Sequence, residues 1–489
     1  MSTAPSTVAE AFRLLQAGDP AAALGISREV IARQPGHARA YLAAGLALRM
    51  MGRLGESRSA IEEALRLDPN DYGAAYEQGM TLAAMGNGAA ARECFVRATR
   101  LRPDFAAPHF ALGMDAIERG DLPAAAAALE NAVRLDPRNP HALMNYGRLC
   151  VRQADFARAA DLFRAALALV PSHPDLPMYL AQVELARGRW AEGWSAYARR
   201  DQRARFEAER AREGAPYRLP DAAALAGAQL LIVGEQGLGD EIFFLRFAPG
   251  LRARGARLAY AGEARLRPLL QRTGLFEEIF AFGEPLPPGR VRLLSGDLPL
   301  LSPQHPVPPS LAIPPESERL DAMRRRLESA GPRPWIGATW RAGTSSEVVA
   351  HALQKTAPIA SLFAALPRDG TVVSLQREGS FDELESASRA LGRPIYDFSA
   401  VNGDLEDALA LLALLDRRVG VSNTNVHLAA AAGATADVLV PFPPEWRWGI
   451  EGDSPWFPGF RVYRQLPGGD WSRAFAALAS AGPGSGSRA

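Results

Sequence analysis

Hydrophobic and polar positions follow one period up to about residue 200 and a different one after residue 229. In the first part, small residues and prolines return every 34 positions in four columns. Columns that share one period predict a repeat array in which each repeat is one supersecondary unit. The columns are Pro35, Pro69, Pro103, Pro137 and Pro171; Gly18, Gly52, Gly86 and Gly120, continued by Ala154 and Gly188; Gly45, Gly79, Gly113 and Gly147; and Ala64, Ala98, Ala132 and Ala166.

The columns predict pairs of helices. Small residues let two helices approach closely, a glycine lets the chain turn between them, and a proline ends the second helix. The pattern resembles the tetratricopeptide repeat from about Pro5 to Arg200, with five full repeats and a sixth in which Arg205 takes the place of the closing proline. Such arrays stack into a superhelix whose groove binds peptides or proteins. A spacer or dimerisation module is the alternative.

A charged run from Arg199 to Glu213 follows the repeats. Opposite charges about four residues apart stabilise a solvent-exposed helix, so we expect a helix or a linker there. The run places the end of the first domain, residues 1–213, near Gly214.

After Gln229 the pattern becomes one of short apolar strands that alternate with amphipathic helices. This βαβ alternation predicts a parallel sheet for residues 214–330. The Pro-rich stretch 285–315 should hold little regular structure, and Glu316–Ser329 should form a bridging helix. The predicted strands are Leu230–Val233, Arg257–Ala261 and Glu278–Ala281, and the predicted helices are 241–252 and 264–272.

Residues 331–489 repeat the alternation and predict a second α/β domain. The fold class is therefore α plus α/β: a helical solenoid followed by two Rossmann-like halves, with a ligand expected between them beyond the carboxyl ends of the strands. The predicted strands are Trp335–Trp340, Thr371–Leu375, Ile395–Asp397, Arg418–Val421 and Val438–Val440, and the predicted helices are Pro358–Leu366, Phe381–Leu391, Leu405–Leu415 and Val426–Ala432.

Composition narrows the function classes. The 489 residues suffice for two to four domains, and 55 Lys and Arg against 54 Asp and Glu give no global charge that favours nucleic acid. No apolar run approaches the roughly 20 residues of a membrane span, and the first residues lack the pattern of a signal peptide. We therefore expect a cytoplasmic protein. Cys94 and Cys150 fall on separate repeats, where they should pack as small apolar residues.

The glycine-rich turn from Gly234 to Asp240 comes directly after the first α/β strand. Its glycines are spaced GxxGxG, which differs from the dinucleotide fingerprint, and the Lys-Ser/Thr pair of a P-loop is absent. Asp240 could cap the following helix or act as a general base at the sheet edge.

A second polar turn, Ser422 to His427, lies between a strand and a helix. Its hydroxyl, amide and N–H groups suit a diphosphate. The alternative is that Ser422 or Asn423 is only an N-cap and that His427 only packs on a neighbour. Lys355 and Thr356 could contact a phosphate as point charge and hydroxyl, or be solvated.

Aromatic residues are dense in the stretches 443–448 and 454–458. Exposed tryptophans there would stack on a sugar or a base, whereas buried ones would hold a loop in place. The sequence contains no HExxH or CxxC pattern and no nucleophile elbow.

Six segments occur in an order that resembles bacterial tetratricopeptide-repeat glycosyltransferases, whose catalytic part is similar to the heptosyltransferases and has the GT-B fold. They are E-Q-G-L-G-D (235–240), S-L-Q (374–376), S-N-T-N-V-H-L (422–428), P-E-W-R-W (444–448), S-P-W-F-P (454–458) and Y-R-Q…G-D-W (463–471).

The resemblance implies an inverting transfer from a nucleotide sugar without a metal or another cofactor. It implies that Asp240 is the general base and that the acceptor lies against the first half. Asn423 stands where the family carries an acid, which leaves the donor sugar open. The implied nucleotide-sugar-binding residues are Gly237, Gly239, Trp340, Lys355, Thr356, Gln376, Asn423, Thr424, Asn425 and His427.

The leading hypothesis is a cytoplasmic glycosyltransferase whose repeats recruit a protein acceptor, with no nucleic-acid partner and no transmembrane segment. One alternative is a transferase that acts on lipopolysaccharide or another glycan. The other is a non-catalytic repeat scaffold with a degenerate transferase domain.

Overall fold

The structure is a computed structural model. Gln236 of the first glycine-rich motif and most of the loop 341–356 lie outside the residues that it describes. The described residues are 7–235, 237–304, 306–342 and 355–482.

The chain forms two compact units. Unit 1 holds most of the repeats, and unit 2 holds the last repeat helices together with the α/β region. Helices α9 and α10 are each divided between the two units. Unit 1 is Met1–Cys150 with Asp161–Pro171, and unit 2 is Val151–Ala160 with Ser172–Ala489.

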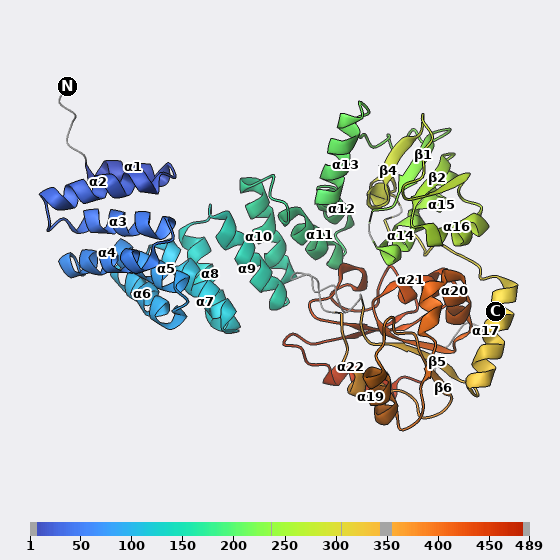
Figure 1. Cartoon of the computed structure of the whole chain (residues 1–489). Coiled ribbons are helices and arrows are strands. Elements are labelled where there is room, and N and C mark those ends of the chain that lie inside the picture. Colours follow the sequence, from blue (N-terminus) through green and yellow to red (C-terminus); the bar gives the residue numbers. More distant parts are fainter. Residues whose placement is uncertain (1–6, 236, 305, 343–354, 483–489) are drawn as a thin grey trace. The chain divides into compact units, whose positions relative to one another are not determined.

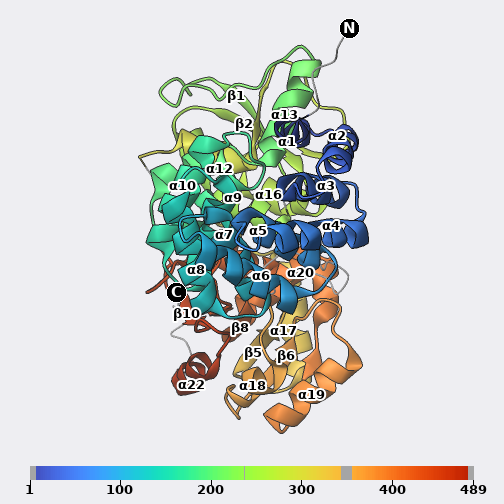
Figure 2. The same ribbon diagram turned by 90° about the vertical axis from the view of Figure 1, so that its left-hand side faces the viewer.

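Unit 1 is built from antiparallel helix pairs that lie side by side along the repeat axis, as Figure 1 and Figure 2 both show. Aspartates at several N-caps accept hydrogen bonds from the first turn, as Asp19 does from the N–H of Ala22 at 2.9 Å. The helices are α1 (Val8–Gln16), α2 (Pro20–Arg33), α3 (Ala38–Met50), α4 (Leu54–Leu67), α5 (Tyr72–Ala84), α6 (Gly88–Leu101), α7 (Ala106–Glu118), α8 (Leu122–Leu135), α9 (Pro140–Arg152) and α10 (Phe156–Leu169).

The glycine column inside the first helix of each pair marks the closest helix–helix contacts. A Cβ atom added at Gly79 would lie 2.5 Å from Cε1 of Phe95, and one at Gly113 would lie 2.7 Å from the Leu129 side chain. Because each large partner stands 16 residues after its glycine, the same contact recurs down the array. The predicted close approach of paired helices is confirmed.

The turn and proline columns also behave as predicted. The turn glycines have positive φ, and Ala154, which interrupts their column, keeps the conformation with φ 65°. Each closing proline lies two residues beyond the end of the second helix, as Pro35 does after Arg33. The repeat geometry therefore follows directly from the 34-residue period.

The last repeat helices belong to unit 2. They are α11 (Leu176–Ala186), α12 (Trp190–Tyr197) and α13 (Asp201–Arg212). Helix α13 confirms the charged helix: none of its residues is buried, and Arg203 donates to Glu207 four residues on at 2.9 Å. Arg205, at the place of the missing proline, lies inside α13.

A buried cluster ties α12 and α13 to the α/β region. The side chain of Arg200 is fully buried and donates to Glu235 at 2.7 and 2.9 Å and to Asp297 at 2.7 Å. Trp194 packs against Phe244 and Trp446. These contacts are why α11–α13 share a unit with the sheets, whereas the predicted domain list, 1–213, 214–330 and 331–489, groups these helices with the repeats. The predicted division into three domains therefore stays a prediction.

Lobe 1 is a four-stranded parallel sheet in the order β3-β2-β1-β4 with its helices α14–α16. Leu230, Leu231 and Ile232 of β1 are fully buried, as expected for a strand covered on both faces. The elements are β1 (Gln229–Val233), α14 (Leu238–Phe244), η1 (Leu245–Phe247), α15 (Ala248–Ala253), β2 (Arg257–Gly262), η2 (Ala264–Leu266), α16 (Arg267–Thr273), β3 (Glu278–Ala281), β4 (Val291–Leu294) and η3 (Ser295–Leu301).

Lobe 2 is a six-stranded parallel sheet in the order β10-β9-β8-β5-β6-β7. If the strands of this sheet are numbered from β5 and read from the β7 edge, the order is 3-2-1-4-5-6, which is that of dinucleotide-binding folds. The order reverses between β5 and β8. The elements are β5 (Trp335–Thr339), α18 (Ile359–Ala364), β6 (Thr371–Ser374), α19 (Phe381–Leu391), β7 (Tyr396–Asp397), η4 (Ser399–Gly403), α20 (Leu405–Leu414), β8 (Arg417–Val421), α21 (Thr424–Ala431), β9 (Asp437–Val440), η5 (Trp446–Trp448), β10 (Arg461–Arg464) and α22 (Ser472–Ser480).

The predicted strands of both lobes are present, with ends shifted by at most one residue. The predicted bridging helix is α17 (Ser317–Ala330), which pairs with α20 through Arg319 and Asp407 at 2.8 Å. The predictions missed β4, β10 and α22. The predicted helix 241–252 is in fact α14, η1 and α15, because Pro249 falls within it.

Two further observations concern the whole described chain. Among the described residues, no helix is both long enough and apolar enough to cross a bilayer. Cys94 on α6 and Cys150 on α9 lie on different helices, and Cys150 is buried.

Candidate functional site: a polar cavity between two parallel sheets

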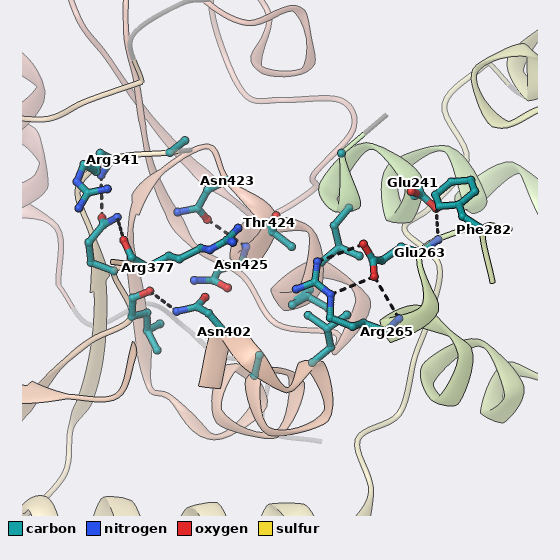
Figure 3. Close-up of a pocket in the computed structure, with 18 residues that line it drawn as sticks. Glu241, Glu263, Arg265, Phe282, Arg341, Arg377, Asn402, Asn423, Thr424 and Asn425 are labelled. Atoms are coloured by element: carbon teal, nitrogen blue, oxygen red, sulfur yellow. Dashed lines mark hydrogen bonds and ion pairs between the residues drawn. The ribbon is translucent and has the colours of Figure 1, made fainter. Parts of the chain in front are cut away.

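A cavity of about 430 Å³ opens between the two lobes of unit 2. Its walls come from segments that directly follow strands of both sheets, and this is where α/β folds bind ligands. Figure 3 shows the lobe 2 residues on one side of the cavity and the lobe 1 residues on the other. The lining residues are Gly237, Leu238, Glu241, Glu263, Arg265, Phe282, Arg341, Ala342, Leu375, Gln376, Arg377, Asn402, Leu405, Ala408, Asn423, Thr424, Asn425 and Leu428.

The lobe 2 wall is built around the start of α21. Asn423 is the N-cap, and its side-chain oxygen accepts from the N–H of Asn425 at 3.1 Å. Its amide group donates to the hydroxyl of Thr339 at 3.0 Å, which links the ends of β8 and β5 at the strand-order reversal. Thr424 and Asn425 line the cavity beside it, so amide, hydroxyl and helix N–H groups meet there, an arrangement that suits an anion.

Gln376 holds the exit of β5 in place. Its side-chain oxygen accepts from the backbone N–H groups of Trp340 and Arg341, both at 3.0 Å. Trp340 itself is fully buried, and its indole N–H donates to Glu383 at 3.0 Å. This corrects the implied binding role of Trp340: its side chain belongs to the core of lobe 2 and does not line the cavity.

Arg341 and Arg377 bring positive charge to the same wall. The Arg341 guanidinium donates to Glu383 at 3.1 Å, whereas Arg377 is 60% exposed and stands 3.9 Å from Glu378. Cations beside a helix N-terminus add to the attraction for an anionic ligand.

The lobe 1 wall carries carboxylates and an aromatic ring. Glu241 projects from the first turn of α14, and Glu263 beyond β2 pairs with Arg265 at 3.2 Å. Phe282, directly after β3, is 56% exposed. Gly237, the N-cap of α14, presents open backbone to the cavity, because an added Cβ there would meet nothing closer than 4.0 Å.

Glu241 has an unusual environment for a carboxyl group. Glu241 is only 1% exposed. Its carboxyl group accepts hydrogen bonds from the hydroxyl of Tyr260 and, at 3.3 Å, from the backbone N–H of Glu263. Burial, with smaller contributions from the carboxylates of Glu263 and Asp240, raises the pKa of Glu241 to about 7. This carboxyl group can therefore gain or lose a proton near neutral pH.

Asp240 takes part in a chain of ion pairs that crosses from lobe 1 to lobe 2. Arg447 donates to both Asp240 and Glu445. Glu445 also contacts Lys355 at 2.6 Å and accepts from the hydroxyl of Ser422 at 3.0 Å. Asp240 is not among the residues that line the cavity.

The pKa values of the residues in this ion-pair chain depend on one another. Burial alone would raise the pKa of Glu445, yet the Lys355 and Arg447 cations hold it well below its ordinary value. Burial opposes the charge of Arg447, but Asp240 and Glu445 raise its pKa above the usual range. Arg447 and Glu445 each have two partners in this chain, so their charges are compensated from two sides.

Gly239 and His427 lie where the two lobes touch. A Cβ on Gly239 would lie 2.9 Å from the His427 ring and 3.4 Å from Cα of Thr424, so this glycine lets α14 approach α21. His427 packs against Phe243 and Phe457, and burial together with Arg447 lowers its pKa well below the ordinary value. Both residues pack between the lobes, and their implied contact with a ligand stays a prediction.

The predicted site residues thus separate into groups. Gly237, Gln376, Asn423, Thr424 and Asn425 line the cavity. Asp240 and Lys355 belong to the ion-pair chain. Three residues take part in packing contacts: Gly239 and His427 between the lobes, and Trp340 in the core of lobe 2. Thr356 is exposed and forms a backbone β-bridge with Arg341.

The sequence analysis missed Glu241, Phe282, Arg341, Asn402 and Arg447 as possible site residues. Their position after strand ends was a usable signal, since the turns that follow parallel strands share one edge of a sheet. The aromatic stretches are explained by the second of the two alternatives: Trp446, Trp448, Trp456 and Phe457 are all buried and hold their loops in place.

Comparison with known proteins bears on the repeats. The sequence model of the tetratricopeptide repeat matches residues 8–72, 110–174 and 151–217. The chain is 31% identical over 326 residues to Protein FlbA of Caulobacter vibrioides (strain ATCC 19089 / CIP 103742 / CB 15), a match that covers 62% of this chain and 54% of that protein. The chain therefore spans about half the length of this relative.

Two solved structures are similar to part of the chain. MamA 41-end from Desulfovibrio magneticus RS-1 is 24% identical with a TM-score of 0.30, over 35% of this chain and 99% of that one. Pseudomonas aeruginosa pilF is 15% identical with a TM-score of 0.35, over 42% and 89%. On the match of the repeat model and the 34-residue helix pairs, the repeats of this chain are tetratricopeptide repeats, and their last members extend into the α/β unit.

Proposed function

We propose that this protein is an inverting glycosyltransferase of the GT-B type, which moves a sugar from a nucleotide-sugar donor to an acceptor hydroxyl. The observation that carries the proposal is the polar cavity between two parallel sheets, lined from the carboxyl ends of their strands. A sheet with the strand order of lobe 2 commonly binds a nucleotide at its point of reversal, where Asn423 and Thr339 meet.

The donor would lie with its diphosphate against lobe 2. Asn423, Thr424 and Asn425 offer amide, hydroxyl and N–H groups at the start of α21. As the bond to the anomeric carbon breaks, negative charge develops on the diphosphate, and groups fixed in advance around it stabilise that charge. Lys355 and Arg447, on the same side of the lobe interface, would add positive charge nearby.

In this proposal Asp240 is the general base. The acceptor hydroxyl gives its proton to the Asp240 carboxylate while its oxygen bonds to the anomeric carbon. The bond between that carbon and the diphosphate oxygen breaks, and its electron pair leaves with the nucleoside diphosphate. Arg447 fixes the direction of the Asp240 carboxylate.

The repeats would deliver the acceptor. Tetratricopeptide arrays bind peptides or proteins in their groove, so the proposed acceptor is a protein, modified in the cytoplasm. A glycan acceptor is the alternative within the same chemistry.

A non-catalytic scaffold is a second candidate, and one observation favours it. Asp240 and Lys355 both have ion-pair partners inside the protein, so their charges are already compensated without a ligand.

A nucleotide-sugar binding screen on the full chain, followed by mass spectrometry of candidate protein and glycan acceptors, tests these proposals. We expect one nucleotide sugar to bind and to add its sugar mass to a protein. The Asp240→Asn variant should still bind the donor but lose at least 100-fold in transfer, on the order expected for a general base. Glu385→Gln removes a carboxylate from the exposed surface of α19 and is the matched control.

Binding of no nucleotide sugar at all would support the scaffold instead. Unchanged transfer and nucleoside-diphosphate release in Asp240→Asn would show that Asp240 is not the base. Sugar mass on a glycan and not on any protein would decide for the glycan acceptor.

A further inference from the structure

Two neighbouring carboxyl groups on α14 have different surroundings. Asp240 reaches Arg447 in the ion-pair chain, whereas Glu241 is part of the cavity wall. Adjacent residues on a helix do not face each other. The first turn of α14 therefore presents one carboxyl to lobe 2 and the other to the cavity.

Two glycines of lobe 1 let the Glu241 carboxyl pack directly against the backbone. Gly234 directly follows β1, and Gly262 is the last residue of β2. A Cβ atom added at Gly234 would lie 2.4 Å from Oε2 of Glu241, and one added at Gly262 would lie 2.5 Å from it. The Tyr260 hydroxyl donates to the same oxygen. Within the described part of the chain, Oε1 of Glu241 has no hydrogen-bond partner, although the residue is almost fully buried.

Few charged or titratable groups lie near the Glu241 carboxyl. Tyr260 and the backbone of Glu263 contact the carboxyl directly, and the Asp240 and Glu263 carboxylates act on it through space. Arg265 is engaged with Glu263, and Arg341 across the cavity with Glu383. No cation pairs with Glu241 among the described residues, so its neutral form is favoured.

Phe282 completes this wall. Its ring lines the cavity beside Glu241 and is 56% exposed (Figure 3). An exposed aromatic face packs against the apolar face of a pyranose, while a neutral carboxyl can donate one hydrogen bond to a hydroxyl oxygen. The opposite wall, with the α21 N-terminus, suits the phosphates.

We propose that Glu241 and Phe282 form the subsite for the sugar ring of the donor, in which protonated Glu241 donates a hydrogen bond from Oε1 to a sugar hydroxyl. This inference rests on the proposed function and adds to it a residue that selects the sugar. The ionised form of Glu241 could only accept a hydrogen bond, so sugar binding should weaken as Glu241 loses its proton.

The first test needs no ligand. Infrared difference spectra of the full chain, wild type minus Glu241→Gln, should contain the carbonyl band of a protonated carboxyl that disappears with a midpoint near pH 7. Glu263→Gln should keep the band and lower its midpoint slightly, because one of the neighbouring negative charges is gone. A band that is absent, or that disappears below about pH 5, would overturn the inference.

The second test compares nucleotide sugars with the nucleoside diphosphates that lack the sugar. UDP-glucose, UDP-N-acetylglucosamine and GDP-mannose are titrated by calorimetry at about pH 6 and about pH 8, with UDP and GDP alongside. For wild type we expect affinity for the nucleotide sugar to fall about tenfold, following the loss of the protonated form. The affinity for the diphosphate, whose terminal phosphate gains negative charge over this range, should not fall.

Glu241→Gln keeps a donor at every pH, so its affinity for the nucleotide sugar should not change between the two conditions. Phe282→Ala should weaken the nucleotide sugar but not the diphosphate. An equal fall for the sugar and the diphosphate, or a fall that persists in Glu241→Gln, would overturn the inference. If neither class of probe binds wild type, the proposed function fails, and the infrared titration still decides whether Glu241 holds the proton.

Discussion

The two units bury different kinds of side chain. In unit 1 the buried polar residues of the described chain are Ser27, Ser57 and Thr81, all of which carry hydroxyls. Ser27 and Thr81 each donate to the carbonyl oxygen four residues earlier, and Ser57 donates to that of Gly45 on the paired helix at 2.8 Å. The remaining interior is mainly alanine and leucine, with larger side chains such as Ile61 and Phe95, so this unit is held together by close apolar contact between helices.

Unit 2 buries charge. Arg200, Asp297, Arg417, Asp437 and Arg447 all lie in its interior and pair with one another or with nearby carboxylates. Burial of charge has a large desolvation cost that ion pairing only offsets. A repeat array has no need of such groups. In the function proposed above, the ligand site lies in unit 2 and the repeats recruit the acceptor.

The largest expected effect comes from Arg200→Met. This change leaves the buried Glu235 carboxylate without a cation and leaves Asp297 with only Arg203, at 3.6 Å, and we expect it to destabilise unit 2 by about 3–5 kcal/mol. Calorimetric unfolding of the full chain should show the transition of unit 2 moving down while that of unit 1 stays in place.

Two variants sharpen this result. Neutralising the acids as well, in Arg200→Met/Glu235→Gln/Asp297→Asn, should recover part of the loss. Arg119→Met in unit 1 removes a half-exposed pair with Asp115 and should cost less than about 1 kcal/mol. Equal losses for Arg119 and Arg200 would contradict the contrast between the units.

The next effect is a dependence of stability on pH that belongs to unit 2. The folded-state pKa of Glu241 is about 7, above the ordinary value near 4.5, so the folded state holds a proton that the unfolded state releases between these values. The contribution is fully present below about pH 4.5 and is lost as the pH rises through 7. Glu241→Gln should remove this loss, worth about 2–3 kcal/mol, in denaturant unfolding at about pH 5 and pH 8.

The matched control for this slope is Glu56→Gln in unit 1. Glu56 lies at the surface, where its hydrogen bond with Arg53 lowers its pKa, so its removal should produce no change of the same sign. A pH slope that survives Glu241→Gln would mean that another group of unit 2 holds the proton.

The interior of unit 1 should be sensitive to volume and not to charge. Gly79→Ala would bring a methyl group to 2.5 Å from the Phe95 ring and 3.0 Å from the carbonyl oxygen of Ala91, and we expect a loss of about 1–3 kcal/mol. Gly25→Ala, on the open face of α2 with nothing within 4 Å, should instead gain up to about 1 kcal/mol. Thermal unfolding of both variants separates packing from helix propensity, and a gain in Gly79→Ala would refute the close contact.

The same contrast explains how much could be predicted from the sequence. The repeat columns follow from one local rule applied every 34 residues, so the helix pairs, their turns and their closing prolines could all be predicted. In unit 2 the alternation of strands and helices was predicted. The strands β4 and β10 were missed because arginines interrupt their short apolar runs and Gly and Pro surround them.

For the site, local pattern and tertiary contact diverged. Asn423 and Thr424 were predicted because a strand that leads into a helix fixes where their groups point. The packing of Trp340 and Gly239 could not be predicted, because only the folded chain shows that one enters a core and the other touches α21. Glu241 was overlooked because its neighbours Tyr260 and Gly262 come from another strand, and no spacing in the sequence brings these residues together.

The smallest effect concerns the repeat rule itself. Ala154 stands in the column of turn glycines and adopts φ 65°, a conformation that costs an L-residue about 1–2 kcal/mol. Ala154→Gly should therefore stabilise the chain by about 1 kcal/mol, after the greater entropy of unfolded glycine is subtracted. Ala127→Gly, at an exposed site within α8, should lose about 1 kcal/mol and is the control. Opposite signs in thermal unfolding would show that the glycine column is set by backbone conformation, whereas losses in both variants would mean that the turn at Ala154 is not strained.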